Sequence, residues 1–190
     1  KIFTMLATLM VVFNGYDFAS QSFTETLGFG LGMVSFFLFF VLLTQVTRQG
    51  FSVNDAGFFL LTIFYVGTTF HSLLYLRMIG LTHFIFLVLV VAISDSAAYF
   101  FGRRFGRHKL APLISPKKTV EGAIGGTLTA VLVGVIFGLV TNLSGSILLL
   151  AMTSLVIAIA GQFGDLVASS MKRRYGIKDF GKLFPGHGGV

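Results

Sequence analysis

Long stretches without a charged residue are the feature that most limits what this chain can fold into. Five such windows cover residues 2–16, 27–47, 56–76, 78–94 and 122–164. A transmembrane helix needs about 20 mostly apolar residues. The last window holds 43 residues, so it is long enough for two helices, with a turn predicted at residues 142–146. The pattern therefore predicts an all-α, polytopic helical membrane bundle with about six spans.

The composition agrees with a lipid environment. Only 11% of the residues are charged and 55% are hydrophobic, whereas average globular chains carry about 25% charged residues. A water-soluble domain, a disordered chain and a coiled coil are therefore excluded. The chain has no cysteine, so any metal ion must be bound by oxygen or imidazole. Despite a net charge of +7, nucleic acid is not expected as a partner of a chain embedded in lipid.

Most of the positive charge falls in two segments, residues 102–121 and 165–190, which are separated by two predicted spans. Lys and Arg mark cytoplasmic loops, so both segments are predicted to face the cytoplasm. This divides the chain into N-terminal membrane helices, residues 1–94, and a region expected to carry the chemistry, residues 95–190. The alternative is that the basic residues only orient the protein or attract anionic lipid.

Two carboxylates, Asp95 and Asp165, lie at the ends of otherwise apolar spans. A carboxylate at membrane depth costs about 2.5–3.5 kcal/mol on insertion scales, and such residues usually serve a site or a partner. On a continuous helix, positions i+4, i+7 and i+8 share a face with position i. After the two acids these positions hold Tyr99, Gly102 and Arg103, and Ser169, Lys172 and Arg173. An acid that can hold a cation, followed by cations that can hold a phosphate, indicates a metal-assisted phosphoryl site. The alternative is an interfacial Asp paired with a nearby Arg.

Two loops have anion-binding character. Ser115 and Pro116 are favoured at the N-cap and first position of a helix, so a helix is predicted to begin there. Its free N–H groups, with Lys117 and Lys118, would attract a phosphate, although a plain capped helix at the membrane surface is an equal alternative. The second loop, residues 178–189, is rich in glycine, whose backbone can turn N–H groups toward an anion. It lacks the Walker A pattern.

Other polar and small residues inside the spans favour structural roles. His71 and His83 are expected to pack, or to form hydrogen bonds between helices, rather than to bind a ligand. Pairs of glycines at four-residue spacing are expected to let helices pack closely. These pairs are Gly122 with Gly126 and Gly134 with Gly138.

The C-terminal run SSMKRRYGIKDFGKLFPGHGGV, which begins at Ser169, resembles the signature of phosphatidate cytidylyltransferases, also called CDP-diacylglycerol synthases. That signature reads S-x-[apolar]-K-R-x4-K-D-x-G-x2-[apolar]-P-x-H-G-G. Residues 95–122, DSAAYFFGRRFGRHKLAPLISPKKTVEG, are similar to the other cytoplasmic segment of this family. The sequence stops at Val190, before the family's Asp-Arg-x-Asp element, so we expect a truncated chain with only part of the metal site.

The resemblance implies an enzyme that joins CTP and phosphatidate to give CDP-diacylglycerol and pyrophosphate. Mg²⁺ is the implied cofactor, and whether a monovalent cation such as K⁺ joins it is left open, as is a homodimer. The expected location is a bacterial cytoplasmic membrane, with the active site facing the cytoplasm. Alternatives are a CTP-dependent enzyme for another membrane lipid, such as a polyprenol kinase, a lipid-binding scaffold without turnover, and a transporter.

The resemblance also implies roles for individual residues. Asp165 is expected to hold the metal. The expected phosphate-binding residues are Lys172, Arg173 and Lys178. Asp179 and His187 complete the expected catalytic set, either by ordering the glycine-rich loop or by contacting the metal or the substrate. The expected substrate-binding residues are Asp95, Ser115, Lys118, Thr119, Ser169, Gly188 and Gly189.

Overall fold

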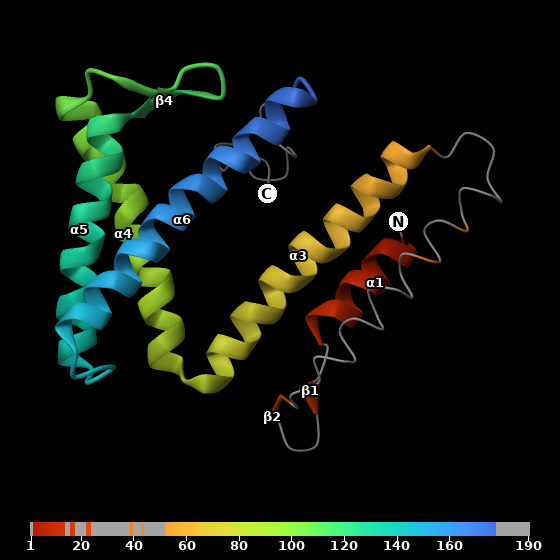
Figure 1. Cartoon of the computed structure of the whole chain (residues 1–190), viewed down its shortest axis with the longest axis horizontal. Coiled ribbons are helices and arrows are strands. Elements are labelled where there is room, and N and C mark those ends of the chain that lie inside the picture. Colours follow the sequence, from red (N-terminus) through yellow and green to blue (C-terminus); the bar gives the residue numbers. More distant parts are fainter. Residues whose placement is uncertain are drawn as a thin grey trace. The chain divides into compact units, whose positions relative to one another are not determined.

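The computed structural model describes residues 2–13, 16–17, 22–23, 39, 43 and 52–177 (Figure 1). The chain divides into two compact units, Lys1–Leu81 and Thr82–Val190. The predicted catalytic residues within the described ranges all belong to the second unit.

Two helices, α1 (Ile2–Val12) and α3 (Val53–Ile79), form the body of the first unit. A short antiparallel pair accompanies them, β1 (Tyr16–Asp17) with β2 (Ser22–Phe23). Ala7, Val11 and Ile63 form the buried core between the two helices. The Nδ1 atom of His71 on α3 lies 3.0 Å from the carbonyl oxygen of Val12. The predicted interhelical hydrogen bond of His71 is thereby confirmed.

Three long helices and a β-hairpin form the second unit. The helices are α4 (Leu81–Phe105), α5 (Val120–Val140) and α6 (Ile147–Arg174). The hairpin pairs β3 (Lys109–Ala111) with β4 (Ser115–Thr119) and runs across one end of the helices (Figure 1). All three helices contribute to one core, made of Phe86, Val90, Ala130, Leu150 and Ala158. Because α4 is continuous from Leu81 to Phe105, the predicted division after residue 94 falls inside a helix, and that division stays a prediction.

Small residues occupy the buried face of α5 and large apolar residues occupy its exposed face. Its buried residues recur at every fourth position, Gly122, Gly126, Ala130, Gly134 and Gly138. The exposed positions between them are large and apolar, Ile124, Leu128, Leu132, Ile136 and Val140. A Cβ atom added at Gly122 or Gly126 would lie 2.6 Å from a backbone carbonyl oxygen of α4. The predicted close packing through these glycines is confirmed, and the large side chains are left to face lipid.

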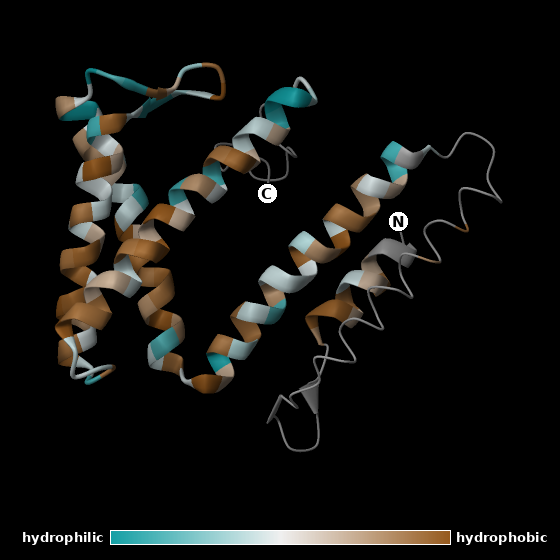
Figure 2. Ribbon diagram, in the orientation of Figure 1, coloured by the Kyte–Doolittle hydropathy of each residue, from teal (hydrophilic) through white to brown (hydrophobic). Residues whose placement is uncertain are grey.

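Four helices in the described part of the chain are long and apolar enough to cross a membrane. They cover residues 54–79, 81–105, 120–140 and 147–174, and Figure 2 shows the hydropathy of their residues along the ribbon. The 43-residue window forms two helices as predicted, with Asn142 at a positive φ of 52° and Ser146 as the N-cap of α6. The first predicted span corresponds to α1, which has 11 residues, and of the second, residues 27–47, the structure describes only residues 39 and 43. The total of six spans stays a prediction.

The prediction that a helix begins at Ser115 is wrong. Residues 115–119 form strand β4, in which Ser115 pairs with Ala111 and Thr119 with Lys109. Helix α5 begins at Val120, and the Thr119 hydroxyl caps it by accepting a hydrogen bond from the Gly122 backbone N–H. Pro116 is compatible with this two-stranded hairpin, since both strands are edges where a missing N–H is tolerated. The pairing to the preceding strand therefore prevails over the local Ser-Pro preference.

Candidate functional site

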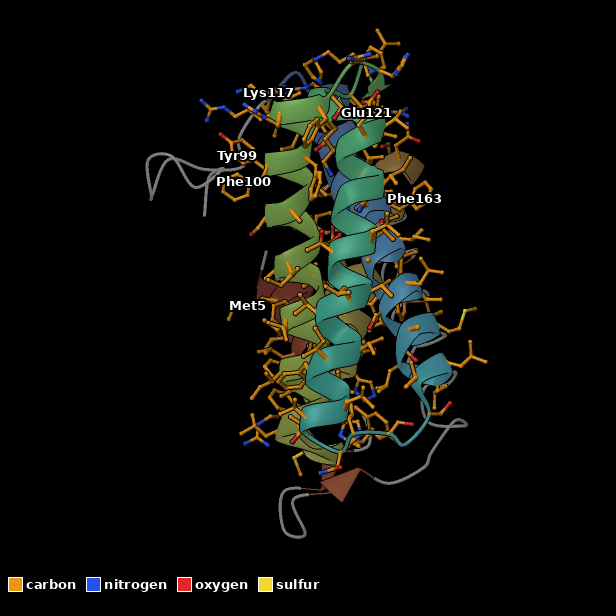
Figure 3. All side chains as sticks on the ribbon, turned by 90° about the vertical axis from the view of Figure 1, so that its left-hand side faces the viewer. Met5, Tyr99, Phe100, Lys117, Glu121 and Phe163 are labelled. Carbon is orange, nitrogen blue, oxygen red and sulfur yellow. The ribbon has the colours of Figure 1, made fainter. Side chains whose placement is uncertain are left out.

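A pocket of about 450 Å³ lies where the hairpin meets α4, α5 and α6. Four cationic and two acidic side chains line it, namely Arg103, Lys109, Lys117, Lys118, Asp95 and Asp165. Figure 3 shows the chain from another side, with the labelled Tyr99 on α4 and Lys117 on the hairpin, which both line the pocket, at the same end of the unit. The excess of positive charge suits an anionic ligand, while the two carboxylates provide oxygen atoms for a cation.

Helix α4 presents to the pocket the face that the spacing predicted. Asp95 lines the pocket together with the residues at i+4, i+7 and i+8, which are Tyr99, Gly102 and Arg103. The Arg103 guanidinium donates a hydrogen bond to the Tyr99 hydroxyl at 3.3 Å. Gly102 allows the hairpin to approach, because a Cβ atom there would lie 2.9 Å from the Thr119 hydroxyl oxygen. The predicted alignment on α4 is confirmed.

Helix α6 brings Asp165 to the same pocket but not the residues predicted to act with it. The helix continues to Arg174, as the prediction required. Ser169, Lys172 and Arg173 are not among the residues that line the pocket. The Arg173 Nε instead donates to the carbonyl oxygen of Ile114 in the hairpin, at 3.4 Å. The substrate roles of these residues stay predictions.

An ion pair joins the hairpin to α6 inside the pocket. The Lys118 Nζ lies 2.5 Å from the Asp165 Oδ2, and the two side chains are 27% and 52% exposed. Lys118 and Thr119 thus reach the pocket as predicted, whereas Ser115 is not part of its lining. The carboxylate expected to hold a metal has a lysine as its partner, in place of the arginine considered as an alternative. A metal ion at Asp165 would have to displace this ammonium group or share the carboxylate with it.

Gln162 is a site residue that the sequence reasoning missed. Its Nε2 lies 3.1–3.2 Å from three acceptors, the Ser94 hydroxyl, the Ala123 carbonyl oxygen and the Thr127 hydroxyl. Because the carbonyl oxygen of Ala123 can only accept, it fixes which end of the amide is the nitrogen. Gln162 therefore ties α4, α5 and α6 together one helical turn from Asp165 and beside Asp95. The available signal was a single amide in an otherwise apolar span, where polar side chains commonly join helices.

Glu121 is a second residue whose role was missed. Its carboxylate accepts hydrogen bonds from the backbone N–H groups of Arg107 and His108, at 3.0 and 3.2 Å. The His108 Nδ1 lies 2.6 Å from the same carboxylate. These contacts fasten the segment after α4 to the first turn of α5. They hold the base of the hairpin, and thereby Lys109 and Lys117, beside the pocket.

The described residues offer part of a metal site. No group of three His, Asp or Glu side chains that could hold a metal ion occurs within residues 2–13, 16–17, 22–23, 39, 43 and 52–177. Two carboxylates, Asp95 and Asp165, nevertheless line one pocket. Mg²⁺ is usually bound by one or two carboxylates, with water and substrate phosphates completing its shell. The pair therefore fits Mg²⁺ bound together with a phosphate ligand.

The remaining predicted residues belong to the glycine-rich C-terminal segment. They are Lys178, Asp179, His187, Gly188 and Gly189, and all lie outside the described residues. Their roles stay predictions. His83, expected to have a structural role, has a buried Nδ1 without a hydrogen-bond partner in the described part of the chain and does not line the pocket.

Comparison with known proteins assigns the family. The chain matches the cytidylyltransferase family over residues 1–190. A Staphylococcus epidermidis phosphatidate cytidylyltransferase is 40% identical over 159 residues, which is 84% of this chain and 61% of that protein. The enzyme of the same name from Bacillus subtilis is 38% identical over 177 residues, 90% of this chain and 66% of that protein. The chain thus spans about three fifths to two thirds of the length of these curated relatives. Because the family match extends over residues 1–190, this chain belongs to the cytidylyltransferase family.

Proposed function

We propose that the protein transfers the cytidylyl group of CTP to phosphatidate, giving CDP-diacylglycerol and pyrophosphate in phospholipid biosynthesis. The observation that carries this proposal is the pocket at the end of α4, α5 and α6, where four cations surround two carboxylates. The family and the names of the bacterial relatives support the same reaction. All substrates in it are phosphate esters or anhydrides, which is the chemistry that a cationic pocket binds.

The reaction needs positioning and charge neutralisation more than a dedicated base. A phosphate oxygen of phosphatidate, already anionic, forms a bond to the α-phosphorus of CTP. The bond from that phosphorus to the bridging oxygen of the β-phosphate breaks, and pyrophosphate leaves. Arg103, Lys109 and Lys117 would bind and orient the phosphate groups, which lowers the barrier by holding the reacting atoms in line.

Mg²⁺ is the cofactor we propose, held by Asp165 and supported by Asp95. When bound, it would neutralise charge on the transferring phosphates. Lys118 would then be released from Asp165 to contact a phosphate. Thr119 lines this pocket. Ser115, Ser169, Lys172 and Arg173, which do not line it, would also contribute to substrate binding, as would Lys178, Asp179, His187, Gly188 and Gly189. A monovalent cation such as K⁺ beside Mg²⁺ and a homodimer are further parts of the proposal.

The proposed location is a bacterial cytoplasmic membrane. Four apolar helices and bacterial relatives support a membrane protein. The two basic segments, residues 102–121 and 165–190, favour a site on the cytoplasmic side by the positive-inside rule. There the pocket would receive CTP from water and phosphatidate from the lipid.

The test is a turnover assay in detergent on the full-length protein and on its Asp165→Asn variant. CTP labelled at the α-phosphate or at the γ-phosphate is supplied with phosphatidate, with Mg²⁺ or with a chelator. We expect the α-label in the lipid product and the γ-label in pyrophosphate, with loss of both signals in Asp165→Asn and after chelation. A γ-label in the lipid would instead show a CTP-dependent lipid kinase. Absence of labelled lipid would refute the proposed reaction, and full activity of Asp165→Asn would refute the proposed metal ligand.

A further inference from the structure

The tip of the β3–β4 hairpin exposes a large apolar side chain. Leu113 is 92% exposed, more than any other large hydrophobic residue that the structure describes. It lies between Pro112, which is also exposed, and Ile114, which is half-buried. Figure 2 shows hydrophobic residues at this tip and several hydrophilic residues along the arms of the hairpin. An apolar residue so exposed outside the membrane-spanning helices needs a reason.

The position of the hairpin places this tip close to the lipid surface. The hairpin connects the end of α4 to the start of α5, so it leaves and returns to the same ends of two candidate spans. It lies across the helix ends and does not extend along their axes (Figure 1). The hydrogen bond from Arg173 to the carbonyl oxygen of Ile114 joins the tip to the end of α6. The tip is thereby held at the level of the helix ends, where lipid headgroups surround a membrane protein.

Cationic side chains outside the pocket lie at the base of the same hairpin. Arg104 and Arg107 are exposed and do not line the pocket. Basic residues next to a membrane-spanning helix attract anionic headgroups within a Debye length of the surface. Apolar residues flanked by cations are typical of segments that lie in the membrane interface. The exposed apolar side chain of Leu113 and the exposed arginines therefore both indicate a lipid surface with anionic headgroups as the partner.

We propose that the hairpin is a separate membrane contact, in which Leu113 at its tip inserts among the lipid headgroups and Arg104 and Arg107 at its base bind anionic lipid. This contact would hold the hairpin in the plane of the interface. It is independent of the reaction proposed above, because it needs neither CTP nor the carboxylates.

The chain offers a clean probe for this contact because it contains no tryptophan. Leu113→Trp introduces the sole indole, whose fluorescence can be measured in vesicles of phosphatidylcholine alone or mixed with phosphatidylglycerol. Lipids brominated near the headgroup or deep in the acyl chain report depth, and iodide reports exposure to water. Leu132→Trp, on the exposed apolar face of α5, is the matched control for a deep position.

We expect shallow-brominated lipid to quench Leu113→Trp several-fold more than iodide does, and deep-brominated lipid to quench Leu132→Trp. The shallow quenching should increase with phosphatidylglycerol, and the Arg104→Gln/Arg107→Gln pair should remove that increase. Strong iodide quenching would place the tip in water, and protection from every quencher would place it against protein. Either result would overturn the proposal, and equal quenching in both vesicle types would overturn anionic lipid as the partner.

Discussion

The ion pair between Lys118 and Asp165 predicts that removing Lys118 increases the metal affinity of the site, although Lys118 is expected to help the reaction. Lys118→Met removes the ammonium group from the carboxylate that we propose as the metal ligand. If ammonium and metal compete for that carboxylate, the variant should bind Mn²⁺, as a substitute for Mg²⁺, more tightly in the absence of CTP. The same variant should bind CTP more weakly, since one phosphate-binding cation is lost.

The magnitude follows from the geometry and exposure of the pair. Two unit charges 4 Å apart attract by about 4 kcal/mol at an effective dielectric constant of about 20, but by only about 1 kcal/mol in bulk water. The Lys118 Nζ and Asp165 Oδ2 are 2.5 Å apart, yet the Asp165 side chain is 52% exposed. Exposed pairs contribute about 0.2–1 kcal/mol, so solvent screening selects the lower estimate. Up to about 1 kcal/mol corresponds to a gain in metal affinity of up to about fivefold.

The assay is a titration of the purified protein with Mn²⁺, with free Mn²⁺ measured by electron paramagnetic resonance. Lys117→Met is the matched control, because Lys117 lines the same pocket and carries the same charge. Each variant removes one positive charge from the same pocket, so the difference between them reports the direct pairing of Lys118 with Asp165. Unchanged or weaker Mn²⁺ binding by Lys118→Met, relative to Lys117→Met, would refute competition for the carboxylate.

Three further predictions concern the supports of the pocket. Gln162→Leu should lower the free energy of unfolding in detergent by roughly 1–2 kcal/mol and raise the KM for CTP. An unchanged KM would contradict a positioning role for Gln162. Glu121→Gln should speed hydrogen exchange at the two backbone N–H groups that now donate to its carboxylate, as measured by mass spectrometry; unaltered exchange would show that the hairpin base is held otherwise. Gly126→Ala should destabilise the fold by about 1–3 kcal/mol, because its Cβ would lie 2.6 Å from a carbonyl oxygen. Gly164→Ala is the control, with nothing within 4 Å of the added Cβ, and equal melting temperatures for the two would refute the packing argument.

The features predicted correctly from the sequence depend on helical periodicity or on the lipid environment of the chain. Lipid requires long apolar helices, so the charge-free windows predicted four helices that the structure describes. The face of α4 that carries Asp95 and Arg103 was predictable because helical periodicity alone determines which residues share it. The close approach through Gly122 and Gly126 was predictable for a similar reason, since small residues at this spacing form one stripe.

The features missed depend on contacts between distant parts of the chain. The Ser115 and Pro116 pair favours a helix start locally, but strand pairing with residues 109–111 outweighs that preference. The partner of Asp165 could not be identified, because Lys118 is 47 positions away and only the tertiary fold brings the two together. Gln162 was visible as an isolated amide, yet its three acceptors lie on two other helices.

The pocket is built from two parts, the packed helices and the β-hairpin, and each can be altered separately. Its carboxylates stand on α4 and α6, whose positions near the pocket depend on the glycines of α5 and on the Gln162 hydrogen bonds. Three of its four cations stand on the hairpin, which Glu121 fastens at its base. Changes in helix packing should therefore affect the binding of a metal ion first, because they separate the two acids. Changes in the hairpin should affect the binding of anionic substrate first, because they withdraw charge while leaving both carboxylates in place.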